Sequence, residues 1–409
     1  MIKRTIFEEV KQSVKTKPVT LVTGARQVGK STLVQNFIKD GFNYVSLDSF
    51  KEARMAQEDP TLFLSLHPWP LIIDEVQKAP QLFDVIEEIV NNEKMKNIHN
   101  YGMYILTGSQ TYKLMKNVSQ SMAGRVSIIH MLGLSRSEIL GISDNKFDYN
   151  LVNINQKAQK NPLKPLELYE NIIKGSYPEL FSNDNLKASK FYSDYVQTYI
   201  ERDVSEIINI KDKYAFKRFI EVLASLTGNE LVYDNLSKIV GVDIKTIQSW
   251  ISILLAGDII YLLEPYNETS VTKRVVKRPK IYFSDTGLAC YLAKLTDPNV
   301  LRASAFGGSF VETYIINELR KNFINNGVEP NFYYYRDTNM NEIDLVILED
   351  GVMHLVECKS GITFNNHSIK AFNRLENTLY KRGMNFVVCA TNSIYPINEN
   401  TYAIPIAGI

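Results

Sequence analysis

The chain has 409 residues, which predicts about two or three domains. Hydrophobic residues make up 45% and charged residues 22%, a composition that excludes a disordered, collagen-like or fibrous protein. Lysine and arginine number 46 against 45 acidic residues, so no overall field draws in a polyanion and any nucleic-acid contact must be local. Three separated cysteines, no signal-peptide pattern and no long apolar run predict a cytoplasmic protein without membrane contact.

Short apolar runs alternate with amphipathic stretches in the first third of the chain. This alternation predicts an α/β fold in which helices cover a parallel sheet. The expected strands are residues 19–23, 43–47, 71–73, 103–106 and 126–131. We expect residues 1–140 to form one domain.

The remaining sequence divides by composition. Residues 141–165 are rich in Asn, Asp, Lys and Gln and predict a linker. Helical spacing of apolar residues follows, which predicts a helical connector over 166–215 and a further domain over 216–298. Residues 299–409 return to one helix followed by strands, with Asp350 and Gly351 as a tight turn, and predict a mixed α/β domain.

Residues 24–32 follow the first expected strand and fit the P-loop pattern. The glycines let backbone N–H groups curl around a phosphate chain, which then lies at a helix N-terminus. Lys30 would reach the β- and γ-phosphates, and the Ser31 hydroxyl would hold Mg²⁺. A chance match is the alternative, against which the strand-loop-helix context argues. The expected nucleotide-binding residues are Gly24, Ala25, Arg26, Gln27, Val28, Gly29, Lys30, Ser31 and Thr32.

Two carboxylates end the strand expected at 71–73. Asp74 can order the Mg²⁺ shell, and Glu75 can take a proton from the attacking water as the general base. An exposed strand end is the alternative for an isolated Asp-Glu pair. The extra strand between the P-loop and these acids, with a catalytic Glu beside the Asp, marks the P-loop proteins that hydrolyse ATP. We therefore expect ATP and Mg²⁺ as the cofactors.

Three further residues are candidates for contact with the nucleotide. Thr107 and Ser109, at a strand end, can sense the γ-phosphate by hydrogen bond, or they can simply form a turn. Arg125 can present its guanidinium to a phosphate in this subunit or in a neighbouring one of a homo-oligomer. A solvated surface arginine is the alternative for Arg125.

Residues 231–255 have the pattern of a helix, a turn at Gly241 and a second helix, as in a helix-turn-helix. Strands expected at 259–263 and 280–283 would complete a winged-helix domain. Such a domain binds DNA or docks on a protein, and both alternatives stay open. If it binds DNA, the groove-facing residues are Lys245, Thr246, Gln248 and Ser249, and the cations at the tip of the wing are Lys273, Arg274, Lys277, Arg278 and Lys280.

Carboxylates also gather in the C-terminal third. A hairpin turning at residues 350–351 would bring Asp344 beside Glu357, with Lys359 on the same face as Glu357. Such a site can hold Mg²⁺ through Asp344 and Glu357, while Lys359 orients water for phosphodiester attack. Glu312, on the preceding helix, can add a carboxylate. The alternative is a solvated sheet face that carries a Glu-Lys pair.

These motifs together resemble a known family. Gly-Ala-Arg-Gln-Val-Gly-Lys-Ser, Ile-Ile-Asp-Glu-Val-Gln, Leu-Thr-Gly-Ser-Gln and Ala-Gly-Arg-Val are followed by residues 199–204, 282–288 and Glu-Cys-Lys-Ser at 357–360. The whole chain is similar to the prokaryotic AAA+-type ATPases that end in a restriction-endonuclease-like domain. The resemblance implies an AAA-type ATPase core, a winged-helix middle and a PD-(D/E)xK-like C-terminal domain, with Glu312, Asp344, Glu357 and Lys359 matching the nuclease pattern.

Two functions are consistent with this sequence. The first is an ATPase coupled to a metal-dependent nuclease that acts on DNA. The second is a nucleotide-gated binding switch whose nuclease-like domain is a catalytically silent docking scaffold. The retained acidic residues and Lys359 favour the first, whereas the near-neutral overall charge favours the second.

Overall fold

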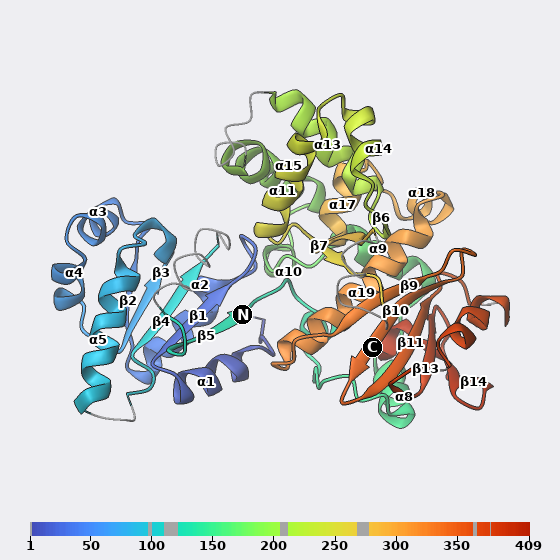
Figure 1. Cartoon of the computed structure of the whole chain (residues 1–409), viewed down its shortest axis with the longest axis horizontal. Helices are drawn as coiled ribbons and strands as arrows, with labels where there is room; N and C mark the ends of the chain where they lie inside the picture. The colour runs from blue at the N-terminus through green and yellow to red at the C-terminus, as the bar shows by residue number, and fades with distance from the viewer. Residues whose placement is uncertain are drawn as a thin grey trace.

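The computed structural model describes residues 2–96, 100–109, 122–204, 212–267, 278–362, 366–376 and 378–409. Figure 1 shows three regions: an N-terminal parallel sheet at the left, a mainly helical middle region at the top, and a C-terminal sheet at the lower right. The fold is mixed α/β, as expected. Within the described residues, no single helix is long and apolar enough to cross a membrane, and only two helices joined at a 106° bend, Tyr233–Val240 and Ile244–Ala256, satisfy that criterion together.

The N-terminal sheet has five parallel strands in the order β2-β3-β4-β1-β5. Alternate residues of β1 belong to different hydrophobic clusters, Leu21 to one and Val22 to the other, because helices cover both faces. All five expected strands are confirmed to within two residues at each end. The strands are β1 (Val19–Thr23), β2 (Asn43–Ser46), β3 (Leu71–Asp74), β4 (Tyr104–Gly108) and β5 (Val126–His130), and the helices are α1 (Phe7–Thr16), α2 (Lys30–Val34), η1 (Gln35–Asp40), α3 (Phe50–Glu58), α4 (Pro60–Leu66), η2 (Val76–Lys78) and α5 (Leu82–Lys96).

The segment expected as a linker, 141–165, is not one extended connection. It contains α8 (Leu151–Lys160), which follows α7 (Arg136–Leu140) and packs against the C-terminal elements β15 and η5. The side chain of Asn150 accepts hydrogen bonds from the first turn of α8, and Ile154 and Ala158 bury one face of the helix. Polar composition concealed this helix because only its narrow inner face is apolar.

The middle region combines helices with a three-stranded antiparallel sheet in the order β6-β8-β7. The expected helix, turn and helix are present as α14 and α15, with Gly241 at φ +82° ending α14, a conformation that favours glycine. The helical elements are α9 (Pro165–Lys174), α10 (Glu179–Ser182), α11 (Ala188–Tyr195), η3 (Val196–Val204), α13 (Lys213–Ser225), α14 (Tyr233–Val240), α15 (Ile244–Ala256), α17 (Thr286–Leu292) and α18 (Pro298–Ala303), and the strands are β6 (Asn229–Glu230), β7 (Ile260–Leu263) and β8 (Lys280–Phe283).

The C-terminal sheet follows the order β14-β15-β13-β11-β10-β9, and β12 pairs with β11. Strands β9, β10 and β11 run antiparallel, whereas β11, β13 and β15 run parallel. Asp350 and Gly351 both have positive φ, which confirms the expected tight turn. The elements are α19 (Gly307–Asn325), β9 (Phe332–Arg336), β10 (Glu342–Glu349), β11 (Val352–Cys358), η4 (Asn366–Leu375), β12 (Lys381–Arg382), β13 (Asn385–Cys389), β14 (Tyr395–Asn398), β15 (Thr401–Pro405) and η5 (Ile406–Gly408).

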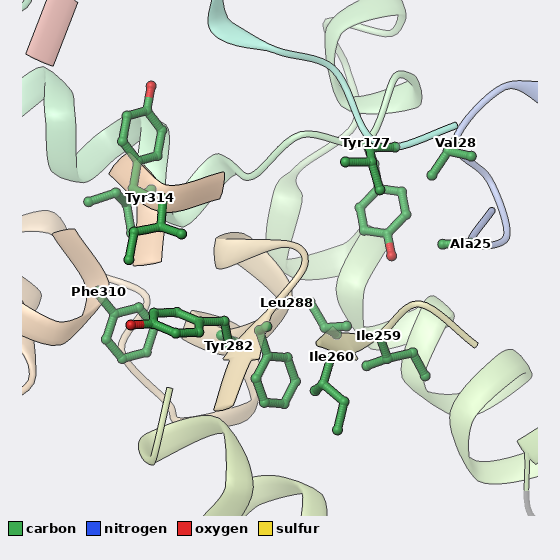
Figure 2. Close-up of a cluster of buried hydrophobic side chains, with 14 of the residues drawn as sticks. Ala25, Val28, Tyr177, Ile259, Ile260, Tyr282, Leu288, Phe310 and Tyr314 are labelled. Atoms are coloured by element: carbon green, nitrogen blue, oxygen red, sulfur yellow. The ribbon is translucent and has the colours of Figure 1, made fainter. Parts of the chain in front are cut away.

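One hydrophobic cluster runs through all three regions. Figure 2 shows Ala25 and Val28 of the P-loop beside Tyr177 of the middle region, with Ile259 near them. Farther along the same cluster, Tyr282 of β8 lies beside Phe310 of α19. The P-loop therefore packs on the middle region rather than standing apart from it.

Candidate nucleotide site and C-terminal acidic cluster

The P-loop leaves β1 at Gly24 and enters α2 at Lys30. Gly24 has φ +141°, and a Cβ there would lie 2.1 Å from the carbonyl oxygen of Met131, so only glycine fits. Gly29 has φ +96° at the start of α2. The Lys30 ammonium donates hydrogen bonds to the carbonyl oxygens of Gly24, at 3.0 Å, and Ala25, at 2.6 Å. The loop therefore curls around its own lysine, and the binding of a phosphate chain there stays a prediction.

Asp74 faces the P-loop, as expected from its place at the end of β3. The Ser31 hydroxyl donates to Oδ1 of Asp74 at 3.0 Å, and the Tyr44 hydroxyl donates to Oδ2 at 2.9 Å. Thr107 also donates to Oδ1 through a short hydrogen bond. The structure thus brings Ser31 and Asp74, the two expected Mg²⁺ ligands of this region, into direct contact.

Glu75 follows at φ +60°, an uncommon conformation for a residue other than glycine. Its Oε2 atom accepts a short hydrogen bond from Nε2 of Gln77 and lies 3.4 Å from the Ser109 hydroxyl. The Glu75 N–H donates to the Thr107 hydroxyl at 3.1 Å. Thr107 therefore braces both acids, and Ser109 lies beside the expected general base.

A cavity of about 1100 Å³ opens over these groups. This volume is of the size that small-molecule sites have. Burial lowers the pKa of Lys30 to about 8, although Glu75, Asp258 and Asp74 oppose that shift. The residues that line the cavity include the P-loop residues Arg26, Gln27, Val28, Gly29, Lys30, Ser31 and Thr32, the acidic-edge residues Glu75, Gln77 and Ser109, and Arg4, Phe7 and Lys11 from α1 and the segment before it.

Sequence reasoning missed Tyr44, Gln77 and the contribution of α1 to this cavity. Tyr44 lies on the strand next to β3, and Gln77 is two residues beyond Glu75. Gln77 stands in the Asp-Glu-Val-Gln motif, so its proximity to Glu75 was a signal that could have been used. No local pattern marks α1, because its contact with the P-loop depends on tertiary packing.

Arg125 does not lie near the P-loop of its own chain. It precedes β5 at the edge of the sheet where β1 begins, whereas Lys30 follows the other end of β1. Its guanidinium contacts Asn91 at 2.7 Å and Glu87 at 3.2 Å, both on α5. The expectation that Arg125 contacts a phosphate of its own subunit is therefore wrong, because parallel strands place the two ends of β1 at opposite edges. Contact with a neighbouring subunit stays a prediction.

The expected DNA-facing side chains of α15 are only partly exposed. Lys245, Gln248 and Ser249 are exposed, whereas Thr246 is half-buried and donates to Asp243 at 2.7 Å. Three of the five wing cations lie outside the described residues, namely Lys273, Arg274 and Lys277. Arg278 is exposed. Lys280 is only 2% exposed, so its expected place at the tip of a wing is wrong.

The C-terminal carboxylates converge as the sequence predicts. Leu345 pairs with Val356 across the hairpin, so the next residues along the two strands are Asp344 and Glu357. Oδ2 of Asp344 accepts a hydrogen bond from the N–H of Cys358 at 2.7 Å. The Lys359 ammonium lies 2.6 Å from Oε1 of Glu357. Burial raises the pKa of Glu357, as does the Asp344 carboxylate, so this cluster holds more negative charge than its surroundings readily solvate.

Glu312 on α19 belongs to the same cluster, and the Lys280 ammonium links it to the carboxylates of the C-terminal sheet. The Lys280 ammonium lies 2.8 Å from Glu312 and 2.6 Å from Glu342. The Tyr282 hydroxyl donates to the same Glu312 oxygen at 2.6 Å. Burial alone lowers the pKa of Lys280, but Glu312, Asp344 and Glu342 raise it above its ordinary value. Strand β8 of the middle region therefore supplies a positive charge to the C-terminal carboxylates.

The donor set of this acidic cluster only partly fits a metal ion. Oε2 of Glu357 is buried and has no hydrogen-bond partner among the described residues, as a ligand atom would be. Glu312, in contrast, already accepts from Lys280 and Tyr282. In the part of the chain that the structure describes, no group of three or more His, Cys, Asp and Glu side chains is arranged to hold a metal ion. Asp344 and Glu357 would thus have to be completed by water or by substrate.

Comparison with known proteins supports the nucleotide site of the N-terminal region. Residues 16–140 match the family model of an AAA domain. Residues 166–299 match a domain of unknown function, DUF8612, and residues 307–409 match another, DUF4143. Uncharacterized proteins of Mycobacterium tuberculosis and Mycobacterium bovis are each 25% identical over 345 residues, which is 84% of this chain and 70% of each relative.

Solved structures give weaker likenesses. The Walker-type ATPase of Pyrococcus abyssi is 12% identical, with a TM-score of 0.41 over 71% of this chain and 96% of that one. RuvB of Thermotoga maritima is 16% identical, with a TM-score of 0.30 over 63% of this chain and 85% of that one. At such TM-scores nothing about the activity of this chain follows from the likeness. The match over 16–140 and the P-loop geometry support an AAA-type ATPase domain, whereas the C-terminal match leaves the restriction-endonuclease-like fold a prediction.

Proposed function

We propose that the N-terminal region binds ATP with Mg²⁺ and hydrolyses it, and that the nucleotide cycle repositions the middle and C-terminal regions. The observation that carries this proposal is the hydrogen bond between Ser31 and Asp74 at the wall of the P-loop cavity. Two segments far apart in sequence meet there with a hydroxyl, a carboxylate and a lysine at the same edge of the sheet. Phosphoryl transfer needs this combination of positioning and charge.

Each residue has a separate task in this proposal. The N–H groups of the P-loop and the Lys30 ammonium bind the phosphates. Ser31 and Asp74 would hold Mg²⁺, which neutralises developing charge on the phosphate oxygens when bound. Glu75, held by Gln77 and Ser109, accepts a proton from the attacking water.

Glu75→Gln tests the assignment of the general base. The amide keeps the shape of the side chain but cannot take a proton, so nucleotide binding is retained while turnover falls about 100-fold or more. Binding of ATP and release of phosphate are measured on the same preparations. Glu88→Gln, on α5, is the matched control. A Glu75→Gln protein that hydrolyses ATP at the normal rate would show that another group is the base.

A second proposal concerns the C-terminal region, as a metal-dependent nuclease that acts on DNA. It is supported by Oε2 of Glu357, which lacks a hydrogen-bond partner within the described ranges, and by Lys359 at 2.6 Å from Glu357. Asp344 and Glu357 would hold Mg²⁺, and Lys359 would orient water. The competing proposal is a silent docking scaffold, which is favoured by the hydrogen bonds that Lys280 and Tyr282 already donate to one oxygen of Glu312.

Plasmid DNA and Mg²⁺ separate the two proposals for the C-terminal region. A nuclease nicks the plasmid, and Asp344→Ala abolishes nicking because the metal loses a ligand. Equal nicking by both proteins, or by neither, removes the nuclease proposal. The ATPase rate with and without added DNA then reports whether the middle region responds to DNA at all.

A further inference from the structure

The turn between α15 and β7, residues 257–259, lies against the edge of the P-loop domain. Asp258 in this turn has φ +55° and a side chain that is only 12% exposed. Its Oδ1 atom lies 3.1 Å from Nε2 of His130. Oδ2 is buried and has no hydrogen-bond partner within the described ranges. A carboxylate from the middle region is thus held, only partly satisfied, at the surface of the N-terminal region.

His130 places this carboxylate close to the P-loop. It is the last residue of β5 and pairs with Thr23, the last residue of β1. The P-loop begins with the next residue, Gly24. The carboxyl ends of parallel strands are the edge where ligands of such sheets bind. Asp258 therefore approaches the edge from which Lys30 acts, and it is among the carboxylates that attract the Lys30 ammonium, together with Glu75 and Asp74.

A second contact joins the same turn to the P-loop. The Arg26 guanidinium lies over the Tyr199 ring, 4.9 Å from its centre. The Tyr199 hydroxyl lies against Gly257, where a Cβ would be only 2.9 Å away. Figure 2 shows Ile259, the residue after Asp258, below Tyr177 in the same hydrophobic cluster as the P-loop residue Ala25. The turn is therefore fixed to the P-loop edge by packing as well as by charge.

We propose that Asp258 competes with the phosphates of a bound nucleotide for Lys30, so that nucleotide binding and docking of the 257–259 turn oppose each other. Asp258 and the phosphates both carry negative charge that attracts the Lys30 ammonium, and the Asp258 side chain is too buried for water to screen it fully. The coupling is reciprocal. If docking of the turn weakens nucleotide binding by a given factor, then a bound nucleotide weakens docking of the turn by the same factor. The inference rests on the proposed nucleotide binding and adds Asp258 as a positioning residue that acts through Lys30.

Asp258→Asn tests the competition. Asparagine keeps the size of the side chain and tolerates positive φ, so the turn can retain its shape. We expect the variant to bind a non-hydrolysable ATP analogue with Mg²⁺ at least about fivefold more tightly than the wild type. The gain shrinks between about 0.05 M and about 0.5 M salt because it comes from charge. Asp234→Asn, an exposed aspartate of α14 that pairs with Lys238, is the matched control and leaves the affinity unchanged.

Improved binding is a useful readout because structural damage would weaken binding. Equal or weaker binding by Asp258→Asn, in a chain whose wild type binds the analogue, overturns this inference and leaves the proposed ATPase intact. A wild type that binds no nucleotide overturns both.

Hydrogen exchange supplies the reciprocal measurement. Adding the ATP analogue and Mg²⁺ to the wild type should speed amide exchange at residues 257–259, because the nucleotide loosens the docked turn. In Asp258→Asn the nucleotide-dependent change should be smaller. Exchange at the turn that stays constant or slows on nucleotide binding in the wild type overturns the inference, whatever the affinities.

Discussion

The P-loop edge and the C-terminal acidic cluster both gather charged side chains at the end of a sheet, but they differ in what meets those charges. At the P-loop edge, the hydrogen bonds of Lys30 within the described part of the chain go to backbone carbonyl oxygens, and Lys30 lies at the wall of a cavity of about 1100 Å³. In the acidic cluster, Lys280 and Lys359 each lie within hydrogen-bond distance of a carboxylate. The first edge thus leaves charge and space for a ligand, whereas the second satisfies most of its charge within the chain.

This difference shows that the identity of a charged residue does not tell whether its side chain is available to a ligand. The sequence alone does not distinguish a lysine that activates a substrate from a lysine that neutralises carboxylates of its own protein. The partners of the lysine distinguish the two, because Lys30 and Lys280 are both buried, but in the parts that the structure describes only Lys280 of this pair lies within hydrogen-bond distance of carboxylates. A buried ion pair of this kind is costly to form and costly to break. Glu312 is a carboxylate neutralised within its own protein, since Lys280 and Tyr282 already donate hydrogen bonds to one of its oxygens. Oε2 of Glu357, which is buried and has no hydrogen-bond partner among the residues that the structure describes, resembles an open position.

The largest effect is expected at the P-loop edge. Lys30→Ala removes the ammonium that binds the phosphates, and nucleotide affinity should fall by about 100-fold or more. Binding of ATP with Mg²⁺ by calorimetry measures the loss. Lys39→Ala, an exposed lysine at the end of η1, should bind like the wild type. Normal binding by Lys30→Ala would mean that the two edges do not differ as described.

At the acidic cluster the corresponding lysine should matter for stability instead. Lys280→Met leaves the largely buried Glu312 carboxylate without its cation, whereas Glu342 keeps Arg336 at 3.5 Å, and the change should cost about 3–5 kcal/mol of unfolding free energy. Denaturant unfolding, followed by a probe of the C-terminal region, measures the cost. Lys238→Met, at an exposed pair with Asp234, should cost less than about 1 kcal/mol.

A second substitution distinguishes the loss of charge pairing from a simple loss of side-chain packing. Glu312→Gln in the Lys280→Met background removes the carboxylate that has lost its cation and should recover part of the stability. If the double variant is no more stable than Lys280→Met, packing rather than charge explains the loss.

The smallest effect concerns pH. Burial, together with the Asp344 carboxylate, raises the pKa of Glu357 from its ordinary value of 4.5 to about 8. Because the folded pKa is raised, the folded state is favoured at low pH, and that stability is lost as the pH rises from 4.5 through about 8. Glu357→Gln should flatten this decline, by about 3 °C in midpoint temperature near the upper end of the window. Thermal unfolding across the window measures the slope. Glu58→Gln, an exposed control, should leave it unchanged, and a wild type whose stability rises across the window would contradict the prediction.

Much of the N-terminal region could be predicted from sequence because its signals are local. Strand β1 is buried at every position, so it reads as an unbroken apolar run, and the P-loop glycines follow it directly. The same holds for Asp344 and Glu357, since a two-residue turn at Asp350 and Gly351 fixes the register of the hairpin.

Other features could not be predicted because their partners are distant in sequence. Lys280 looked like one member of a basic surface run, yet its partners are on α19 and β10. The segment 141–165 looked like a linker, yet α8 buries Ile154 and Ala158 in the shared core. Arg125 looked available to a nearby phosphate, yet the direction of β1 places it at the far edge of the sheet.

The sequence by itself determined the strands of the N-terminal sheet, the phosphate-binding loop and the acids at 74 and 75, because each depends on residues adjacent in the chain. Tertiary structure alone decided which charged groups remain open to a ligand. Packing of β8 on α19 buries Lys280 among carboxylates, and packing of the 257–259 turn on the P-loop edge places Asp258 beside His130. Burial and distance set the strength of these interactions, and neither quantity exists before the chain folds.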